Sequence, residues 1–140
     1  MAREALGALR VGLDLIEIGR VRAALERPGF RERCFTEAER AYCDSRRNPA
    51  QSYAARFSGK EAIGKALGCG VRFTWREIEI AGRPKNSFQN EDPGGKPEVS
   101  LSGKTAAWAE RMGAREIDLS MTHSKGMAAA VAILIAGNGE

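Results

Sequence analysis

Two kinds of hydrophobic pattern follow each other along this chain, one typical of strands and one typical of helices. Residues 11–18, VGLDLIEI, form a nearly continuous apolar run of the length expected for a buried strand. In residues 19–30 the apolar side chains recur at helical spacing instead, and Pro28-Gly29 is a stop signal for that helix. The pattern therefore predicts a strand that leads into a short basic helix.

Capping signals predict further helices downstream. Thr36 and Glu39 have the spacing of a capping box, and Asn48 followed by Pro49 is typical of an N-cap and a first helical residue. Ser102 is a candidate cap for a later helix. The expected helices cover residues 37–43, 49 to 68 or 70, and 104–113.

The remaining segments predict strands, most of them by alternating apolar and polar residues and the last one by its apolar run after a turn. They cover residues 75–82, 98–103, 116–123 and 127–136, and the last two form a hairpin around a turn at 124–126. A polar stretch, residues 83–95, is typical of a long exposed loop. The mixed order of strands and helices predicts an α+β fold, with a single domain over 1–140 and a mainly antiparallel sheet packed by helices.

Composition and charge limit the classes of function. With 22 basic and 18 acidic side chains, the net charge is +4 and the pI is about 9.2, which favours an acidic partner or a phosphorylated ligand. Three cysteines without a C-x-x-C pair, and one histidine, indicate neither a zinc site nor a disulfide framework. The longest apolar run, 127–136, is too short to span a bilayer, and the N-terminus lacks a signal-peptide core. We therefore expect a cytoplasmic protein with reduced thiols.

The segment RFSGKEAIGKALG, residues 56–68, places charges on two edges of one helix. At about 100° per residue, Glu61 and Lys65 share a face away from the apolar stripe, while Arg56 and Lys60 form a second cationic edge on its other side. The simplest interpretation is a solvated face with an ordinary Glu–Lys pair.

Two interior glycines in this helix favour a more specific interpretation. Each costs about 1 kcal/mol relative to alanine, which a close approach of another backbone or of a ligand usually offsets. Gly59 points into the apolar stripe, so tight packing explains it, whereas Gly64 lies on the polar side, where a bound molecule could approach.

Asp14 is a carboxylate within an apolar strand, and burial there is unfavourable unless the group is paired, hydrogen-bonded or bound to a cation. An aspartate that accepts backbone N–H groups at the strand's end is the alternative. Together with Glu61, Asp14 would suit Mg²⁺, which takes one or two carboxylates and completes its shell with water and phosphate oxygens. The sequence alone does not show that the two carboxylates meet.

Several blocks of this sequence resemble the successive motifs of one enzyme family. The blocks are GLDLIEIGRVR (12–22), CFTEAE (34–39), RFSGKEAIGKALG (56–68), GGKPEVSLSG (94–103) and LSMTHSKGMAAAVAIL (119–134). In this order they are similar to holo-[acyl-carrier-protein] synthases, the small bacterial type of 4'-phosphopantetheinyl transferase. The match includes G-x-D before the basic helix together with K-E-A-x-x-K-A-x-G.

The resemblance implies an Mg²⁺-dependent transferase with that family's α+β fold. Such an enzyme moves the 4'-phosphopantetheine group from coenzyme A to a serine of an apo acyl carrier protein and releases adenosine 3',5'-bisphosphate. It supports fatty-acid or polyketide biosynthesis in the cytoplasm. The family is typically a homotrimer with sites at subunit interfaces, so this too is expected, and neither nucleic acid nor a membrane is an expected partner.

The resemblance also assigns roles to individual residues. Asp14 and Glu61 match the magnesium ligands, and Glu61 and Lys65 are the expected catalytic residues. For coenzyme A the implied residues are Arg56, Lys60, Lys65, Lys96, Pro97 and His123. For the carrier protein, Arg20 matches the family motif, and Arg22 and Arg27 are inferred from their clustering on the same basic segment, as are Arg31 and Arg33. The chain departs from the family in having Ser58-Gly59 where two small apolar residues are more common, and in its longer 83–95 loop.

Three questions stay open from the sequence. The base that deprotonates the acceptor serine is Lys65, Glu61 or a metal-bound water. A non-catalytic subunit that binds coenzyme A or a nucleotide would keep the cationic edge without needing both carboxylates. A basic RNA-binding module would explain the pI, although only 6% of the residues are aromatic and stacking platforms are therefore scarce.

Overall fold

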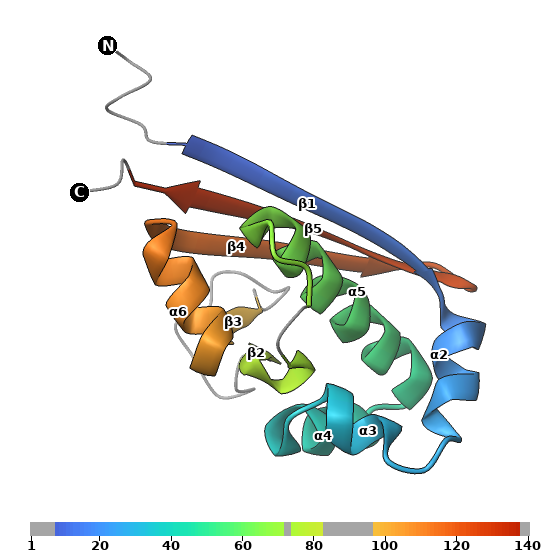
Figure 1. Cartoon of the computed structure of the whole chain (residues 1–140). Coiled ribbons are helices and arrows are strands. Elements are labelled where there is room, and N and C mark those ends of the chain that lie inside the picture. The colour runs from blue at the N-terminus through green and yellow to red at the C-terminus, as the bar shows by residue number, and fades with distance from the viewer. Residues whose placement is uncertain (1–7, 72–73, 83–96, 138–140) are drawn as a thin grey trace, which may run out of the picture.

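The computed structural model describes residues 8–71, 74–82 and 97–137. Within these ranges the elements are, in chain order, β1 (Ala8–Glu17), α2 (Ile18–Leu25), α3 (Phe30–Cys34), α4 (Glu37–Asp44), α5 (Pro49–Leu67), the 3₁₀ helix η1 (Trp75–Glu77), β2 (Ile78–Ala81), β3 (Glu98–Leu101), α6 (Gly103–Arg111), β4 (Ala114–His123) and β5 (Met127–Ala136). Figure 1 shows the long strands as one layer, with α5 lying along one face of it.

The main sheet has the strand order β1-β5-β4, and all its pairs are antiparallel. β1 pairs with β5 along its whole length, from Ala8 opposite Ala136 to Glu17 opposite Met127. β4 and β5 form the predicted terminal hairpin, and a bulge interrupts the register between Ala114 and Glu116. β1 and β4 are therefore the two opposite edges of this sheet, and the predicted α+β fold is confirmed.

The central helix, α5, packs on the sheet at very short range. Its start is fixed as predicted, with the Asn48 side chain accepting a hydrogen bond from Gln51 N and with Pro49 in the first turn, and it ends at Gly68 in the left-handed conformation. A Cβ atom at Gly12 of β1 would lie only 1.8 Å from the Ala62 carbonyl oxygen, so glycine is needed where strand and helix backbones touch. Buried alanines of β5, at 128, 130 and 132, keep the sheet side of this contact small.

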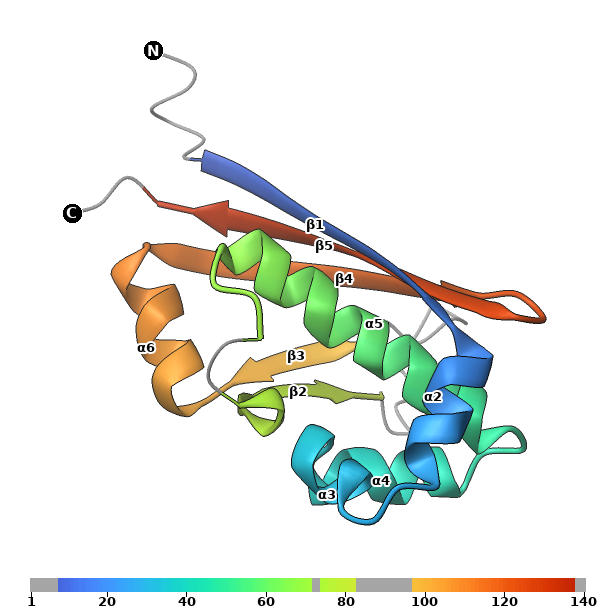
Figure 2. The same ribbon diagram turned by 45° about the vertical axis from the view of Figure 1, so that its right-hand side comes forward.

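Two hydrophobic clusters pack against α5, one near each end of the helix. One joins the helix to β2, α6, β4 and β5, and the other joins its first half to α2, α3 and α4. In the turned view the short pair β2-β3 and α6 lie on the side of α5 away from the long strands (Figure 2). None of the helices in the described ranges combines the length and the apolar character that a bilayer-spanning helix requires.

Three local expectations need correction. Residues 75–77 form a 3₁₀ turn, so the strand that the sequence predicts from 75 begins at Ile78 instead. The short helix α3 was not predicted. Ser102 occupies the N-cap position of α6 without a side-chain bond; the Glu77 carboxylate accepts from Lys104 N and Thr105 N in its place. The 83–95 loop lies outside the described residues.

Candidate functional site

Asp14 is held where β1 crosses α5. Lys65 Nζ donates to the Leu13 carbonyl oxygen at 2.9 Å and lies 3.3 Å from Asp14 Oδ1. The Ser58 hydroxyl lies 3.0 Å from Asp14 Oδ2 and 3.1 Å from the Asp14 carbonyl oxygen, with either as its acceptor. Ser58 and Lys65 are two helical turns apart on α5, so they contact the two carboxylate oxygens from different directions.

Glu61 belongs to the same cluster. Burial raises the pKa of its carboxyl group above the usual value, the Asp14 carboxylate raises it further, and the Lys65 ammonium opposes both effects. The two carboxylates are therefore close enough for the charge of Asp14 to act on Glu61, which the sequence alone could not show.

The donor groups of this cluster are two carboxylates. Among the described residues there is no group of three or more His, Cys, Asp or Glu side chains that could hold a metal ion. Two acidic side chains without a sulfur or imidazole donor are nevertheless the chemistry that Mg²⁺ uses, because this ion keeps water and substrate phosphates as its other ligands. Asp14 and Glu61 therefore fit Mg²⁺ as two of its ligands.

The two glycines of α5 are both explained by packing. At Gly59 a Cβ atom would lie 2.7 Å from Ile80 Cδ1, which confirms the tight contact expected there. At Gly64 it would lie 2.6 Å from the carbonyl carbon of Gly70, whose N–H donates to the Gly64 carbonyl oxygen at 2.9 Å. The expectation of a ligand beside Gly64 is therefore wrong, because the returning backbone occupies that space.

A pocket of about 780 Å³ opens at the β4 edge of the sheet. Three of the residues expected to bind coenzyme A, Arg56, Pro97 and His123, line it. Asp14, Glu61 and Lys65 are not among its lining residues, and Asp14 belongs to β1, the opposite edge strand. The predicted site residues thus form two separate groups within one chain.

Arg56 is a buried cation in this pocket. It is 5% exposed, its Nε donates to the Ile80 carbonyl oxygen at 3.3 Å, and its guanidinium carbon lies 4.2 Å from the centre of the Tyr42 ring. Within the described part of the chain no carboxylate forms an ion pair with it. A buried charge without a counter-charge is unfavourable, so this arrangement favours an anionic ligand.

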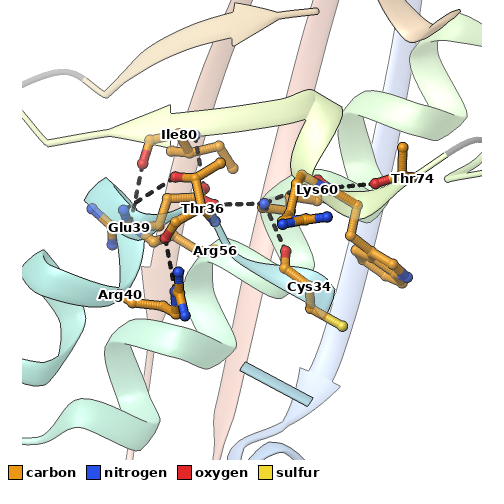
Figure 3. A network of polar contacts seen from close by, with 10 residues as sticks. Cys34, Thr36, Glu39, Arg40, Arg56, Lys60, Thr74 and Ile80 are labelled. Carbon is orange, nitrogen blue, oxygen red and sulfur yellow. Dashed lines mark hydrogen bonds and ion pairs between the residues drawn. The ribbon is translucent and has the colours of Figure 1, made fainter. Parts of the chain in front are cut away.

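Lys60 does not line this pocket, which goes against its assignment as a residue that binds coenzyme A. Its side chain is fully buried, and Nζ donates to Glu39 Oε1 at 2.6 Å and to the carbonyl oxygens of Cys34 at 2.8 Å and Trp75 at 3.0 Å (Figure 3). Burial lowers the pKa of the Lys60 ammonium, and the Glu39 carboxylate opposes that effect. All three donors of the ammonium therefore have protein acceptors, and Lys60 joins α5 to the capping-box residue of α4 and to the segment before β2.

The arginines expected to bind a carrier protein surround α2 and α3. Arg20 and Arg22 lie on α2, Arg27 follows its end, and all three are exposed, as is Arg33 on α3. Arg31 is only partly exposed, because it donates to the Leu25 carbonyl oxygen at 3.1 Å and pairs with Asp44.

Some residues of these two groups were missed by the sequence analysis. Arg46 and Arg47 line the pocket together with Arg56, and their position directly before the N-cap Asn48 was the signal that could have identified them. Ser58 had been noted only as a departure from the resembling family, and Tyr42 carried no sequence signal. Lys96 lies outside the described residues.

Comparisons with known proteins identify relatives that match most of this chain. Residues 10–131 match the model of the 4'-phosphopantetheinyl transferase superfamily. The chain is 44% identical over 129 residues to a holo-[acyl-carrier-protein] synthase of Caldanaerobacter subterraneus, covering 91% of this chain and 94% of that protein. It is 41% identical over 128 residues to the protein of the same name from Moorella thermoacetica, covering 90% and 93%.

Solved structures show the same fold. A complex with coenzyme A described as the ACPS of Chronobacterium ammoniagenes aligns with a TM-score of 0.76 and 28% identity, over 94% of this chain and 99% of that one. The holo-[acyl-carrier-protein] synthase of Helicobacter pylori in complex with coenzyme A aligns with a TM-score of 0.71 and 25% identity, over 89% and 98%.

Proposed function

Because this chain belongs to the 4'-phosphopantetheinyl transferase superfamily, we propose that it is a holo-[acyl-carrier-protein] synthase. In this reaction the hydroxyl oxygen of a carrier-protein serine attacks the β-phosphate of coenzyme A, the bond to the bridging oxygen breaks, and adenosine 3',5'-bisphosphate leaves. The proton of the hydroxyl is taken up by a base, and the product is the holo carrier protein.

The observation that carries the proposal is the buried Arg56, which forms no ion pair with a described residue, in a pocket that is also lined by Arg46, Arg47 and His123. The matching phosphorylated ligand is coenzyme A, whose adenosine part carries a 3'-phosphate. Arg56, His123 and Pro97 are the proposed contacts on this side, with Lys96 kept from the sequence analysis.

Asp14 and Glu61 are the proposed ligands of Mg²⁺, which when bound neutralises charge on the reacting diphosphate. Lys65 lies beside them and presents its positive charge where negative charge develops on the leaving phosphate. The Ser58 hydroxyl keeps the Asp14 carboxylate oriented. Glu61 and Lys65 are thus the catalytic residues of the proposal.

The two groups of residues are proposed to complete one another across a subunit interface in a homotrimer. One group lies at the β1 edge and the other at the β4 edge, with α5 packed on the sheet between them. The outer face of β1 exposes Leu9, Val11, Leu13 and Leu15 by 59–68% each, next to Ile133 of β5. Exposed apolar side chains in a continuous row are typical of a face that another protein covers.

The proposed acceptor is an acidic acyl carrier protein that docks on the exposed Arg20, Arg22 and Arg27. Charge complementarity of this kind accelerates association and fixes orientation. The pathway is fatty-acid or polyketide biosynthesis, and the location is the cytoplasm, a proposal that fits the lack of a disulfide bond among Cys34, Cys43 and Cys69.

Intact-mass spectrometry of an apo acyl carrier protein tests this function. The carrier protein is incubated with this protein, coenzyme A and Mg²⁺, and EDTA replaces the metal in a parallel sample. We expect a phosphopantetheine adduct only with metal, and we expect Glu61→Gln to abolish it while the affinity for coenzyme A stays within a few fold. Coenzyme A binding by the wild-type protein without an adduct on several carrier proteins would favour the non-catalytic subunit instead.

A further inference from the structure

Tyr42 lies between two cationic side chains of the pocket. Its ring centre is 4.2 Å from the guanidinium carbon of Arg56 and 5.3 Å from that of Arg46. Both distances are within the range of cation–π attraction. The three residues come from α4, from the segment between α4 and α5, and from α5, and all three line the pocket.

The two arginines depend on this ring to different degrees. Arg56 is buried, and its other contact in the described ranges is the Nε hydrogen bond to the Ile80 carbonyl oxygen at 3.3 Å. Arg46 is exposed and belongs to a loop, and among the described residues the Tyr42 ring is the contact that limits its orientation. If the ring were removed, the Arg46 side chain would sample more rotamers in the free protein. It would then lose more conformational entropy when a ligand binds, which weakens binding.

The position of the ring is itself fixed by the backbone of Gly82. A Cβ atom at residue 82 would lie 3.0 Å from Tyr42 Cε2 and 3.3 Å from Tyr42 Cζ. These distances are shorter than ordinary carbon contacts, so a methyl group at this position would shift the ring by a few tenths of an ångström. The pocket therefore contains an aromatic ring with a guanidinium within reach of it from two different segments.

We propose that Tyr42 is a positioning residue, which holds Arg46 and Arg56 as a pair of phosphate ligands and thereby sets the preference of the pocket for a 3'-phosphorylated nucleotide. The inference rests on the proposed coenzyme A site and adds to it a residue that need not touch the ligand. Guanidinium groups bind phosphate oxygens through paired N–H donors, so their relative orientation decides how many donors reach one phosphate.

Isothermal titration of the full-length protein with two nucleotides tests the proposal. Adenosine 3',5'-bisphosphate and adenosine 5'-monophosphate differ by the 3'-phosphate alone. The dissociation constant of the monophosphate divided by that of the bisphosphate therefore measures the preference for the 3'-phosphate. We expect Tyr42→Leu to reduce this ratio about tenfold, mainly by weakening the bisphosphate, because an aromatic contact to each guanidinium is lost. Tyr42→Phe keeps the ring and should keep the ratio within about twofold of wild type.

Two further variants separate positioning from general loss of structure. Phe30→Leu removes another partly buried ring, outside the pocket, and should leave the ratio unchanged. Gly82→Ala displaces the Tyr42 ring without removing it and should lower the ratio in the same direction as Tyr42→Leu. It keeps the proposal testable if the leucine variant does not fold.

The outcomes distinguish this inference from the function on which it rests. A wild-type protein that binds both nucleotides equally would contradict the proposed coenzyme A site, and the inference with it. A wild-type preference that survives in Tyr42→Leu, or in Gly82→Ala when the leucine variant does not fold, would overturn the role of Tyr42 alone. An equal fall of the ratio in Tyr42→Phe would also overturn the proposed role, because the effect would then depend on the Tyr42 hydroxyl and not on the ring.

Discussion

Replacing Lys60 with methionine tests whether this lysine stabilises the fold or binds a ligand. The wild-type ammonium lies 2.6 Å from Glu39 Oε1, and both side chains are fully buried. Glu39 also accepts from Thr36 N at 2.8 Å and from Ile80 N at 2.9 Å, so its charge stays in place when the lysine is removed. The variant would therefore leave a buried carboxylate without its counter-charge.

The expected loss of stability follows from this geometry. Breaking a buried ion pair on one side costs about 3–5 kcal/mol. The carbonyl oxygens of Cys34 and Trp75 also lose a donor, but these losses overlap with the first and do not simply add. Because a domain is stable by about 5–15 kcal/mol, Lys60→Met is expected to remove a large part of the free energy of unfolding.

Urea unfolding followed by far-UV circular dichroism measures this loss, at one fixed protomer concentration because assembly contributes to stability. For an m value of about 2 kcal/mol/M, the midpoint should fall by about 2 M. Lys65→Met is the matched control on the same helix: the Lys65 side chain is 52% exposed, and we expect a stability change below about 1 kcal/mol.

Two results would refute this reasoning. The first is a Lys60→Met protein with nearly wild-type stability, which would mean that the pair is not held as described. The second is a stable variant whose affinity for coenzyme A falls about tenfold, which would return Lys60 to the ligand site. The double variant Glu39→Gln/Lys60→Met should be more stable than the sum of the single losses predicts, because neither charge is then left alone.

The remaining predictions concern assembly, acid stability and carrier-protein docking. Leu13→Arg puts a charge in the exposed apolar row and should shift the native mass to that of a monomer and abolish turnover, whereas unchanged assembly would argue against this face as the interface. The pKa of Glu77 is lowered, because hydrogen bonds from Thr105 and the α6 N-terminus outweigh a desolvation effect of opposite sign. This stabilisation is present above the pKa of Glu77 in the unfolded chain and is lost as pH falls through its pKa in the folded protein. The loss of unfolding free energy caused by Glu77→Gln at pH 7 should therefore be smaller in acid. An equal loss at neutral and acid pH, measured by urea unfolding, would contradict this. Reversing the charges of Arg20, Arg22 and Arg27 should raise KM for the carrier protein on the order of tenfold and leave KM for coenzyme A unchanged, and an equal rise in both would argue against docking there.

Local signals in the sequence predicted much of the fold. The capping box at Thr36 and Glu39 and the Asn48-Pro49 start of α5 are present as expected, because such caps depend on residues only a few positions apart. The antiparallel hairpin of β4 and β5 is also confirmed. The short α3 and the 3₁₀ turn before β2 depend instead on tertiary packing, including the stacking of Phe57 on Trp75 with ring centres 4.4 Å apart.

The candidate site was predicted less completely, for a physical reason. A helical wheel gives the direction of a side chain but not what another element places in front of it. Lys60 and Arg56 share one edge of α5, yet Glu39 neutralises the lysine, while the arginine faces the Tyr42 ring and forms no ion pair with a described residue. Gly64 likewise faces the backbone of Gly70 rather than a ligand.

Asp14 and Glu61 come close because of the way in which β1 packs on α5, and neither segment alone determines that packing. Two carboxylate ligands could be expected from the residue types alone, whereas their proximity depends on the fold. The roles of these residues, like the single-domain organisation, stay predictions.

The measurement that tests the central claim most directly is complementation between two inactive variants. Glu61→Gln impairs the proposed metal side, and Arg46→Glu reverses a charge of the proposed coenzyme A side. The two are co-expressed with different tags, the mixed oligomer is purified, and phosphopantetheine transfer is followed by the intact mass of the carrier protein. If each site joins the two sides from neighbouring subunits, every mixed trimer contains one fully wild-type site out of three, so about a third of wild-type activity should be restored. Activity no higher than that of the separate variants would contradict a site shared between subunits.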